Sequence, residues 1–499
     1  MAKESKNREA RQEQKTEEAP QVYVVQKDLT GWRFSRRDFL AAAGAAAAGA
    51  LATGCGPTAS REERARMEAC KDIRAHTHSV AALATSPDGT LLASAGADKT
   101  IKLWSLPEGT LLKTLKGHTR SVSELVMSPD GTLLASGSTD RTIKLWSLPE
   151  GALVKTLEGH TDSVGELAVS PDGTLLASAE AWAWPEPEDK TIKLWSLPEG
   201  TLLKTLKGHT RSVSELVMSP DGTLLASGST DRTIKLWSLP EGALVKTLEG
   251  HTDSVGELAV SPDGTLLASA ASWDKTIKLW SLPEGTLLQT LEGHTDWVRE
   301  LAVSPDGTLL ASASVDKTIR LWSLPEGTLL QTLKDHTDWG VLRLAVSPDG
   351  TLLASAGADK TIKLWSLPEG TLLKTLKGHT DEVWGLAVSP DGTLLASASN
   401  DGTIRLWSLP EGEFVSCLMD LAANEPDVEG VTYELETASG QTIEYTLPCG
   451  APIPPGAVCV CNCVAGSYVP PPCSCVGDTA PSCTCVGYTA PSVHYWHPC

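Results

Sequence analysis

The chain is dominated by one repeated unit. The phrase SPDGTLLAS occurs eight times, and the phrase LWSLPEG also occurs eight times. The tryptophans of successive LWSLPEG copies lie 42 to 49 residues apart, from Trp104 to Trp407. Such a period is too long for one hairpin and suits a unit of four short strands.

Each unit alternates strand-forming segments with turn residues. In the copy covering 110–148, segments 110–118, 121–128, 133–138 and 142–148 have the alternation or β-branched content of strands. Pro and Gly separate them in the SPDG and LPEG phrases, where Pro presets φ and Gly accepts a positive φ. The unit is therefore predicted to be a small antiparallel sheet.

A four-stranded sheet of this size cannot bury both of its faces by itself. Stacking the copies around an axis buries them against one another, and closing the ring removes most exposed edges. The predicted fold is all-β: a β-propeller, with eight four-stranded blades favoured. Segment 413–419 is expected to complete the first blade as an outer strand, in competition with segment 69–74.

The repeated pattern GH…SPDGTLLASGSxDxTIKLW resembles the WD-repeat family, over residues 76–418. The usual Trp-Asp is Trp-Ser in every copy. The resemblance implies a propeller whose blades are held by a hydrogen-bonded His, Ser, Asp and Trp. It also keeps open seven blades plus a spare repeat, since seven is the common family number. The sets in the second and eighth copies are His118, Ser136, Asp140 and Trp146, and His379, Ser397, Asp401 and Trp407.

These sets are interpreted as structural and not catalytic. A Ser, His and Asp combination is also the composition of a hydrolase triad. Here it recurs eight times at one spacing, each time with a Trp, whereas a nucleophile would occur once. A buried indole N–H needs an acceptor, which the Ser supplies. The chain is therefore expected not to be an enzyme.

The repeats differ at a few positions, and those differences favour a binding role. Residues 98–179 and 189–270 are identical, so they present the same surface twice, while the third copy carries an eight-residue insertion, 180–187. Non-repeat aromatic and arginine residues follow the loops of the third and fifth to eighth copies. The candidate partner-binding residues are Trp182, Trp184, Trp273, Trp297, Arg299, Trp339, Arg343 and Trp384.

The N-terminal region has the pattern of an export signal. Residues 1–34 are polar and predicted to be disordered, and 35–55 begin Ser35-Arg36-Arg37-Asp38-Phe39-Leu40 before an Ala/Gly-rich apolar run. This segment resembles a bacterial twin-arginine signal, which implies an extracytoplasmic location in the cell envelope. Cys55 resembles the cysteine of a lipoprotein box, and cleavage after 50–52 is the alternative. Residues 56–72 are interpreted as a linker before the propeller at 73–419.

The C-terminal region has a different composition. Residues 420–448 are predicted to form a connector and a β-hairpin about Ser439-Gly440, and 449–499 a cysteine-rich tail. The tail could bind Zn²⁺ or Cu(I), form disulfides, or be modified covalently. No cofactor is certain. The candidate metal ligands are Cys459, Cys461, Cys463, Cys473, Cys475, Cys483 and Cys485.

Charge and composition narrow the function. The formal net charge is -20, and an acidic chain repels phosphate backbones, so nucleic acid is not expected as a partner. The favoured function is an exported protein-interaction scaffold that binds a protein or peptide on its Trp-rich loops. Membrane attachment could come from the signal segment or from a lipidated Cys55. The alternative is a metal-binding or redox protein that acts through the tail.

Overall fold

The computed structural model describes residue 70, residues 74–180 and 189–420, and the backbone of several short strands outside them. The chain divides into two units, 1–59 and 60–499. In the first, β1 (Lys27–Asp28) pairs with β2 (Gly31–Trp32) as antiparallel strands. The expected signal segment, Cys55 and the insertion residues Trp182 and Trp184 lie outside the described residues.

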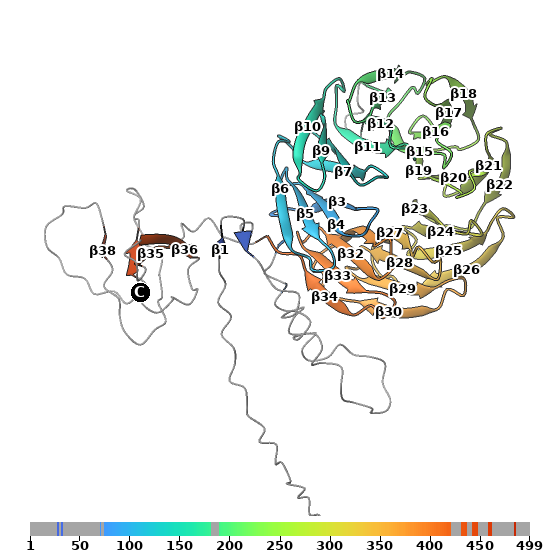
Figure 1. Cartoon of the computed structure of the whole chain (residues 1–499). Coiled ribbons are helices and arrows are strands. Elements are labelled where there is room, and N and C mark those ends of the chain that lie inside the picture. Colours follow the sequence, from blue (N-terminus) through green and yellow to red (C-terminus); the bar gives the residue numbers. More distant parts are fainter. Residues whose placement is uncertain are drawn as a thin grey trace, which may run out of the picture. The chain divides into compact units, whose positions relative to one another are not determined.

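Eight four-stranded antiparallel sheets form a ring, so the prediction of an eight-bladed propeller is confirmed (Figure 1). The strands of the first four blades are β3 (Val80–Thr85), β4 (Leu91–Gly96), β5 (Ile101–Ser105), β6 (Leu111–Leu115); β7 (Val122–Met127), β8 (Leu133–Ser138), β9 (Ile143–Ser147), β10 (Ala152–Leu157); β11 (Val164–Val169), β12 (Leu175–Glu180), β13 (Ile192–Ser196), β14 (Leu202–Leu206); β15 (Val213–Met218), β16 (Leu224–Ser229), β17 (Ile234–Ser238), β18 (Leu244–Leu248).

The other four blades follow the same order. Their strands are β19 (Val255–Val260), β20 (Leu266–Ala271), β21 (Ile277–Ser281), β22 (Leu287–Leu291); β23 (Val298–Val303), β24 (Leu309–Ser314), β25 (Thr318–Ser323), β26 (Leu329–Lys334); β27 (Val341–Val346), β28 (Leu352–Gly357), β29 (Ile362–Ser366), β30 (Leu372–Leu376); β31 (Val383–Val388), β32 (Leu394–Ser399), β33 (Ile404–Ser408), β34 (Phe414–Cys417). The first strand of each blade lies nearest the centre and the fourth lies on the rim (Figure 1).

The hydrophobic core lies between neighbouring blades. Ile101 and Leu103 of the first blade pack with Leu134 and Trp146 of the second in one buried cluster, and the other neighbouring pairs of blades repeat this arrangement. The small Ala and Ser residues of the second strand in each blade let the neighbouring sheet approach closely. Each blade therefore buries its faces against its neighbours, as the repeat predicts.

The LPEG turn shapes the rim of each blade. Gly151 has a φ of +59°, and a Cβ atom there would lie 2.4 Å from Cδ2 of Leu115 on the neighbouring blade. Only glycine satisfies both the positive φ and the close approach. The turn is short, so it returns the chain to the strand it has just left.

This turn corrects the expected closure of the ring. The outer strand β34 pairs with β33 and so completes the eighth blade, not the first. The first blade already has its own outer strand, β6, so segment 69–74 has no empty position to fill either. The expectation was wrong because it assigned each outer strand to the following blade, whereas the LPEG turn joins it to the preceding strand.

The ring closes through contacts and not through a shared sheet. Leu92 and Trp104 of the first blade pack with Ile404 and Leu406 of the eighth. The N–H of Ala75 donates to the carbonyl of Gly402 at 2.9 Å. A disulfide joins Cys70, which the sequence places in the linker, to Cys417 of β34. The chain entering the ring is thereby attached to the blade that ends it.

In the C-terminal region, β35 (Val431–Glu436) and β36 (Thr442–Leu447) pair as an antiparallel hairpin at the predicted position. Strand β37 (Val458–Cys461) pairs with β35, and β38 (Thr484–Cys485) pairs with β37 in parallel. The side chains of the tail cysteines lie outside the described residues. Among the described residues, no helix is long and apolar enough to cross a membrane.

Candidate functional site

The structure brings the four predicted side chains of the second blade into one network. Nε1 of Trp146 donates to Oγ of Ser136 at 2.9 Å, and Nε2 of His118 lies 2.8 Å from the same oxygen. Nδ1 of His118 lies 2.9 Å from Oδ2 of Asp140. The eighth blade has the corresponding distances of 2.9, 2.8 and 3.2 Å among Trp407, Ser397, His379 and Asp401.

The carboxylate of this network holds two loops together. Asp140 accepts the backbone N–H groups of Thr119 and Thr142 and the hydroxyl of Thr142. Burial alone would raise the pKa of Asp140, but these hydrogen bonds and His118 lower it to about 2. The loop before the first strand and the loop between the second and third strands therefore open at the same end of the blade.

Ser136 cannot act as the nucleophile of a hydrolase in this arrangement. Its side chain is fully buried, and its oxygen is occupied by Trp146 and His118. The serines at this position in the other seven blades are equally buried: Ser94, Ser178, Ser227, Ser269, Ser312, Ser355 and Ser397. The geometry is that of a support for the loops.

The candidate binding residues in the described part of blades 5 to 8 separate into two kinds. Trp273 and Trp339 are exposed, by 63% and 76%. Trp297 and Trp384 are half-buried. The indole of Trp273 meets that of Trp297 edge to face, with 4.9 Å between the ring centroids. These four residues are called the tryptophan face below.

Both predicted arginines lie against this face. The guanidinium of Arg299 lies 4.9 Å from the ring centroid of Trp297, and that of Arg343 lies 5.8 Å from the centroid of Trp384. Contacts of this length are cation–π interactions. The contact of Arg343 with Trp384 joins blades 7 and 8, whereas Arg299 and Trp297 both belong to blade 6.

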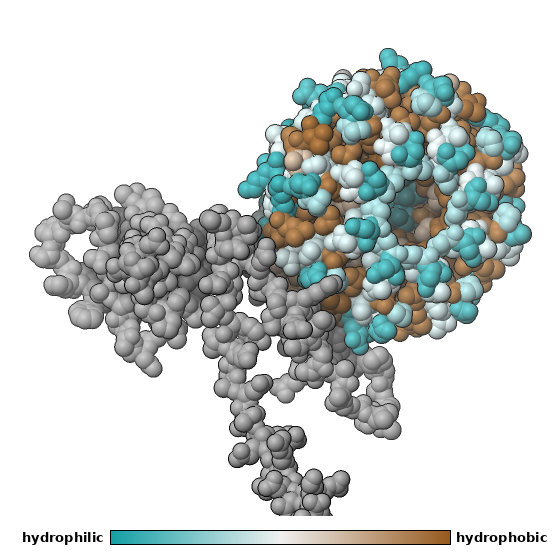
Figure 2. Space-filling view, in the orientation of Figure 1, coloured by the Kyte–Doolittle hydropathy of each residue, from teal (hydrophilic) through white to brown (hydrophobic). Residues whose placement is uncertain are grey.

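Sequence reasoning missed the residues that line the centre of the ring. The first strands of blades 2 to 6 each place one glutamate at the same position, and blade 7 places Arg343 there, 3.5 Å from the carboxylate of Glu300. Figure 2 shows the hollow at the centre of the disc. The signal was present as the repeated Glu of the SELVM and GELAV phrases. The glutamates are Glu124, Glu166, Glu215, Glu257 and Glu300.

The channel strongly perturbs these carboxyl groups. Burial raises the pKa of Glu124 and Glu300 to about 7, against the opposing charge of Arg343. Burial, followed by repulsion from neighbouring glutamates, raises the pKa of Glu166 and Glu215 well above the ordinary range. Burial therefore works against ionisation of these glutamates, which line a channel next to the tryptophan face.

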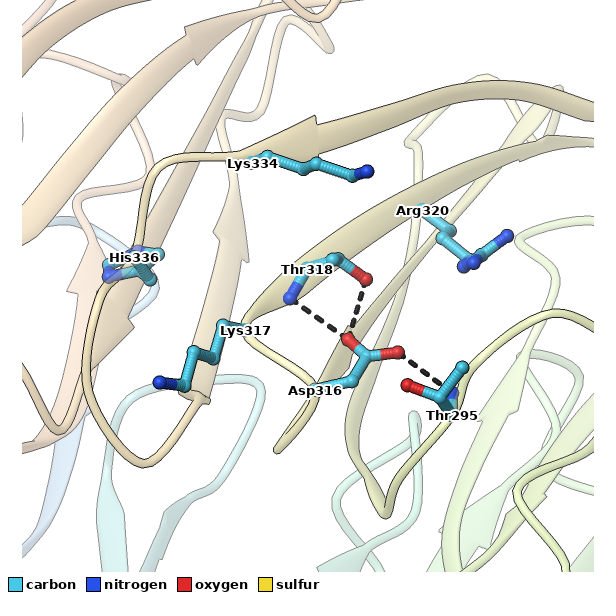
Figure 3. A pocket seen from close by; sticks show the side chains of 7 residues that line it. All are labelled: Thr295, Asp316, Lys317, Thr318, Arg320, Lys334 and His336. Atoms are coloured by element: carbon cyan, nitrogen blue, oxygen red, sulfur yellow. Dashed lines mark hydrogen bonds between the residues drawn. The ribbon is translucent and has the colours of Figure 1, made fainter.

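A polar pocket lies between blades 6 and 7 (Figure 3). Its carboxylate, Asp316, accepts the N–H of Thr295 and both the N–H and hydroxyl of Thr318. The ammonium of Lys317 donates to the carbonyl of Thr337. Its main polar groups are thus engaged in holding loops, as in the other blades.

The rim carries a second apolar surface that the sequence reasoning did not single out. The outer strands expose paired leucines, such as Leu202 with Leu203 and Leu329 with Leu330, each 41–49% exposed. They alternate with lysines and glutamines, so the apolar surface is divided into small patches around the circumference.

The fold and the repeated networks define a closed eight-bladed propeller in which the shared residues hold the blades together. The chain belongs to the WD40 family, whose propellers are typically protein-interaction scaffolds without catalytic activity. The WD domain, G-beta repeat family matches residues 68–105, 109–147, 151–196, 200–238, 242–281, 285–323, 327–366 and 370–408.

A solved structure supports the same fold. The crystal structure of the computationally designed Ika8 protein matches with 31% sequence identity and a TM-score of 0.59, covering 67% of this chain and 97% of that chain. No curated protein matches this chain. The WD-repeat resemblance in the sequence is therefore confirmed.

Proposed function

We propose that this chain is an exported, non-catalytic scaffold that holds a protein or peptide partner on the tryptophan face. The observation that carries the proposal is the exposure of Trp273 and Trp339 on a rigid ring. Large exposed aromatic side chains are costly in water unless a partner covers them, and Trp is enriched where binding energy concentrates.

The surroundings of these residues support a polar, specific interface. Arg299 and Arg343 lie against the neighbouring indoles, and Arg is the other residue type favoured at such centres. The closed ring holds the loops in place before binding, which lowers the entropy lost on association. The formal net charge of -20 favours a partner with basic groups over a nucleic acid.

The disulfide between Cys70 and Cys417 supports export. Disulfides persist in oxidising compartments such as the bacterial periplasm and are rare in the cytosol. We infer an extracytoplasmic location, with the segment at 35–55 as the export signal and as the candidate for membrane attachment. Changing Arg36 and Arg37 to Lys should keep the protein in the cytoplasm, which cell fractionation would measure.

A capture experiment tests the binding face. The Trp273→Ala, Trp339→Ala double variant should lose at least about tenfold in affinity for a partner captured from envelope extract, identified and then titrated in pure form. Leu330→Ala is the matched control, because it removes an exposed apolar side chain from the rim of the same molecule. Unchanged affinity in the double variant, with both variants folded, would contradict the proposal.

A further inference from the structure

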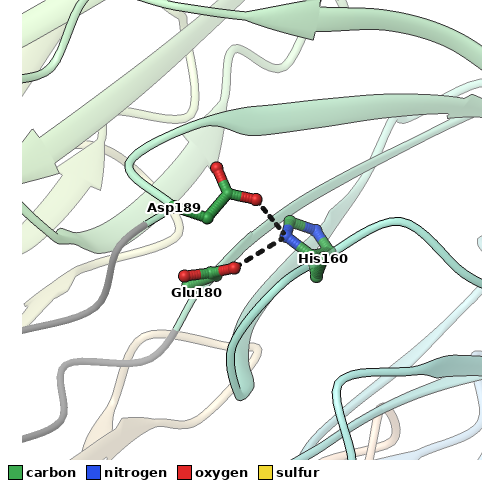
Figure 4. Close-up of side chains that lie close together, drawn as sticks. All are labelled: His160, Glu180 and Asp189. Atoms are coloured by element: carbon green, nitrogen blue, oxygen red, sulfur yellow. Dashed lines mark ion pairs between the residues drawn. The ribbon is translucent and has the colours of Figure 1, made fainter.

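The histidine of the third blade lacks a bond that the other seven blades have. Nε2 of His160 lies 2.8 Å from Ser178, as in the other blades. Its Nδ1, however, lies 3.5 Å from Oδ2 of Asp189 and 3.7 Å from Oε1 of Glu180 (Figure 4). In the other blades the corresponding nitrogen and carboxylate are 2.8–3.2 Å apart. Among the described residues, Nδ1 of His160 has no hydrogen-bond partner.

The third blade departs from the others at Glu180, where its insertion begins. The third and fifth blades have identical sequences up to Ala179 and Ala270, after which the third has Glu180 where the fifth has Ala271. In the fifth blade, Nδ1 of His251 lies 2.8 Å from its aspartate. The insertion thus adds a second carboxylate to an otherwise standard network.

Glu180 is held rigidly, but among the described residues only one of its two carboxylate oxygens has hydrogen-bond partners. Its side chain is 1% exposed, and Oε1 accepts the backbone N–H groups of Thr161 and Asp162 at 3.0 and 2.8 Å. Its other oxygen, Oε2, is buried and, in the described part of the chain, has no hydrogen-bond partner. Burying carboxylate oxygens without a partner is costly, so the site has an unmet need for positive charge.

We propose that His160, Glu180 and Asp189 form a binding site for a divalent transition-metal ion, with Zn²⁺ as the favoured ion. One donor atom from each residue lies within 4.8 Å of the others, and no second group of this kind occurs within 74–180 and 189–420. Zn²⁺ binds His nitrogen and carboxylate oxygen at about 2.0–2.2 Å, which places neighbouring tetrahedral ligands about 3.3–3.6 Å apart. The separations of 3.5 and 3.7 Å are close to this range and longer than a hydrogen bond of the other blades.

The surroundings suit a metal-bound histidine. With Nδ1 on the metal, the Nε2–H of His160 can donate to Ser178, whose oxygen already accepts Nε1 of Trp195 at 2.8 Å. Such a second contact orients the imidazole of a metal ligand. Three protein ligands leave a fourth position for water or an exogenous ligand.

Lys193 already neutralises part of the negative charge at this site. Nζ of Lys193 lies 2.8 Å from Oδ2 of Asp189, but it leaves Oε2 of Glu180 unpaired. The equivalent Lys144 of the second blade instead donates to Thr156 on the outer strand, at 2.8 Å. Metal binding is therefore expected to release Lys193 toward Thr205, its register partner on β14.

Zinc titration of the full chain tests the site. Free thiols are alkylated without reductant, so that tail cysteines do not contribute, and bound Zn²⁺ is counted after removal of all metal by a chelator. Wild type should bind one Zn²⁺ more than Glu180→Ala, or bind it at least about tenfold more tightly, since even an outer contact to a metal ligand is worth 10–100-fold. Zn²⁺ should also raise the melting temperature of wild type and not that of Glu180→Ala.

Matched variants keep the test decisive. Glu180→Ala recreates the residue found in the folded fifth blade, and Glu180→Gln keeps the side-chain shape without the charge. His160→Gln and His251→Gln each remove one network histidine, but only His160→Gln should lose the zinc equivalent. Equal zinc stoichiometry, affinity and thermal shift in wild type and the folded Glu180 variants would overturn the proposal, as would equal losses in the two histidine variants.

Discussion

Cys70 and Cys417 are joined by a disulfide that spans 347 residues, with their Cα atoms 6.2 Å apart. Cys70 precedes the first strand of the first blade, and Cys417 ends the outer strand of the eighth. No strand is shared between these blades, so the disulfide is the covalent part of the ring closure. A propeller with all blades built from consecutive strands depends on such contacts to stay closed.

Removing this disulfide should destabilise the propeller. Cys70→Ser is expected to lower the free energy of unfolding by about 2–5 kcal/mol, because the cross-link restricts the unfolded chain over a long loop. Denaturant unfolding under non-reducing conditions measures the effect. Reductant should lower the stability of wild type toward that of the variant and change the variant much less. A variant as stable as wild type would show that the apolar contacts alone close the ring.

The ion pair between Lys102 and Asp420 is the second element of closure. Lys102 lies on β5 and is 3% exposed, and its ammonium contacts the carboxylate that follows β34. Asp420→Asn should cost about 3–5 kcal/mol, because it leaves a buried ammonium without its carboxylate. The Lys102→Met, Asp420→Leu double variant should recover most of this loss in thermal unfolding. If the double variant is as unstable as Asp420→Asn, the loss of stability comes from altered packing and not from the unpaired ammonium.

The stability of a blade should depend on the serine hydroxyl at the centre of its hydrogen-bond network. Ser136→Ala leaves the indole N–H of Trp146 and a nitrogen of His118 without their shared partner, and should cost about 1–3 kcal/mol. Ser147→Ala, on the neighbouring strand β9, should change stability by no more than about 0.5 kcal/mol. Equal effects of the two substitutions on chemical unfolding would argue against the network as the main support of the blade.

The channel glutamates should make stability depend on pH. The pKa of Glu124 is raised to about 7 by burial, so the folded state binds more protons than the unfolded state between about pH 4.5 and 7. Its contribution to stability therefore falls as pH rises through this interval. Glu124→Gln should match wild type near pH 4.5 and exceed it by about 1–2 kcal/mol above pH 7, because water in the channel screens part of the effect.

Taking the difference between Glu124→Gln and wild type removes the contribution of the blade histidines, and it includes the response of Glu166 and Glu215, whose pKa values depend partly on the charge of Glu124. Burial lowers the pKa of His76, His118 and His379, which gives stability the opposite slope below about pH 6.5. These histidines are the same in both proteins. A stability difference that stays constant from pH 4.5 to 8 would show that Glu124 is not perturbed in the channel.

Within the tryptophan face, substituting the packed Trp297 should destabilise the fold more than substituting the exposed Trp339. Trp297 is half-buried between Trp273 and Arg299, so Trp297→Ala should cost at least about 2 kcal/mol through lost packing. Trp339 is 76% exposed, and Trp339→Ala should change stability by about 0.5 kcal/mol or less. Thermal unfolding of the two variants compares them. A large loss in Trp339→Ala would show that this side chain packs in solution.

Local features were predictable because short-range physics decides them. The SPDG and LPEG phrases predicted the turns, and the alternating segments predicted the strands. The resemblance to WD repeats implied the network of His118, Ser136, Asp140 and Trp146. The resemblance to WD repeats was carried by the same residues and is confirmed. The twin-arginine signal, Cys55 and the cysteine-rich tail remain predictions.

Features that depend on ring closure were not predictable in the same way. The outer strand 413–419 was expected on the first blade, and Cys70 was placed in a linker, because neither sequence segment shows what lies beside it. Glu124 and Glu300 are on blades 2 and 6, and nothing in their local sequence indicates that the channel brings them near each other. The effect of Glu180 on His160 is likewise visible only in three dimensions.

By itself, the sequence determined the repeating sheet, its turns and its internal hydrogen-bond network, since each of these involves residues within one period of the chain. The tertiary structure alone decided how the ring closes, which carboxylates share the channel and which tryptophans stay exposed. The physical reason is that these features depend on the summed rotation of eight stacked sheets. That rotation brings residues hundreds of positions apart into contact, and no local pattern records it.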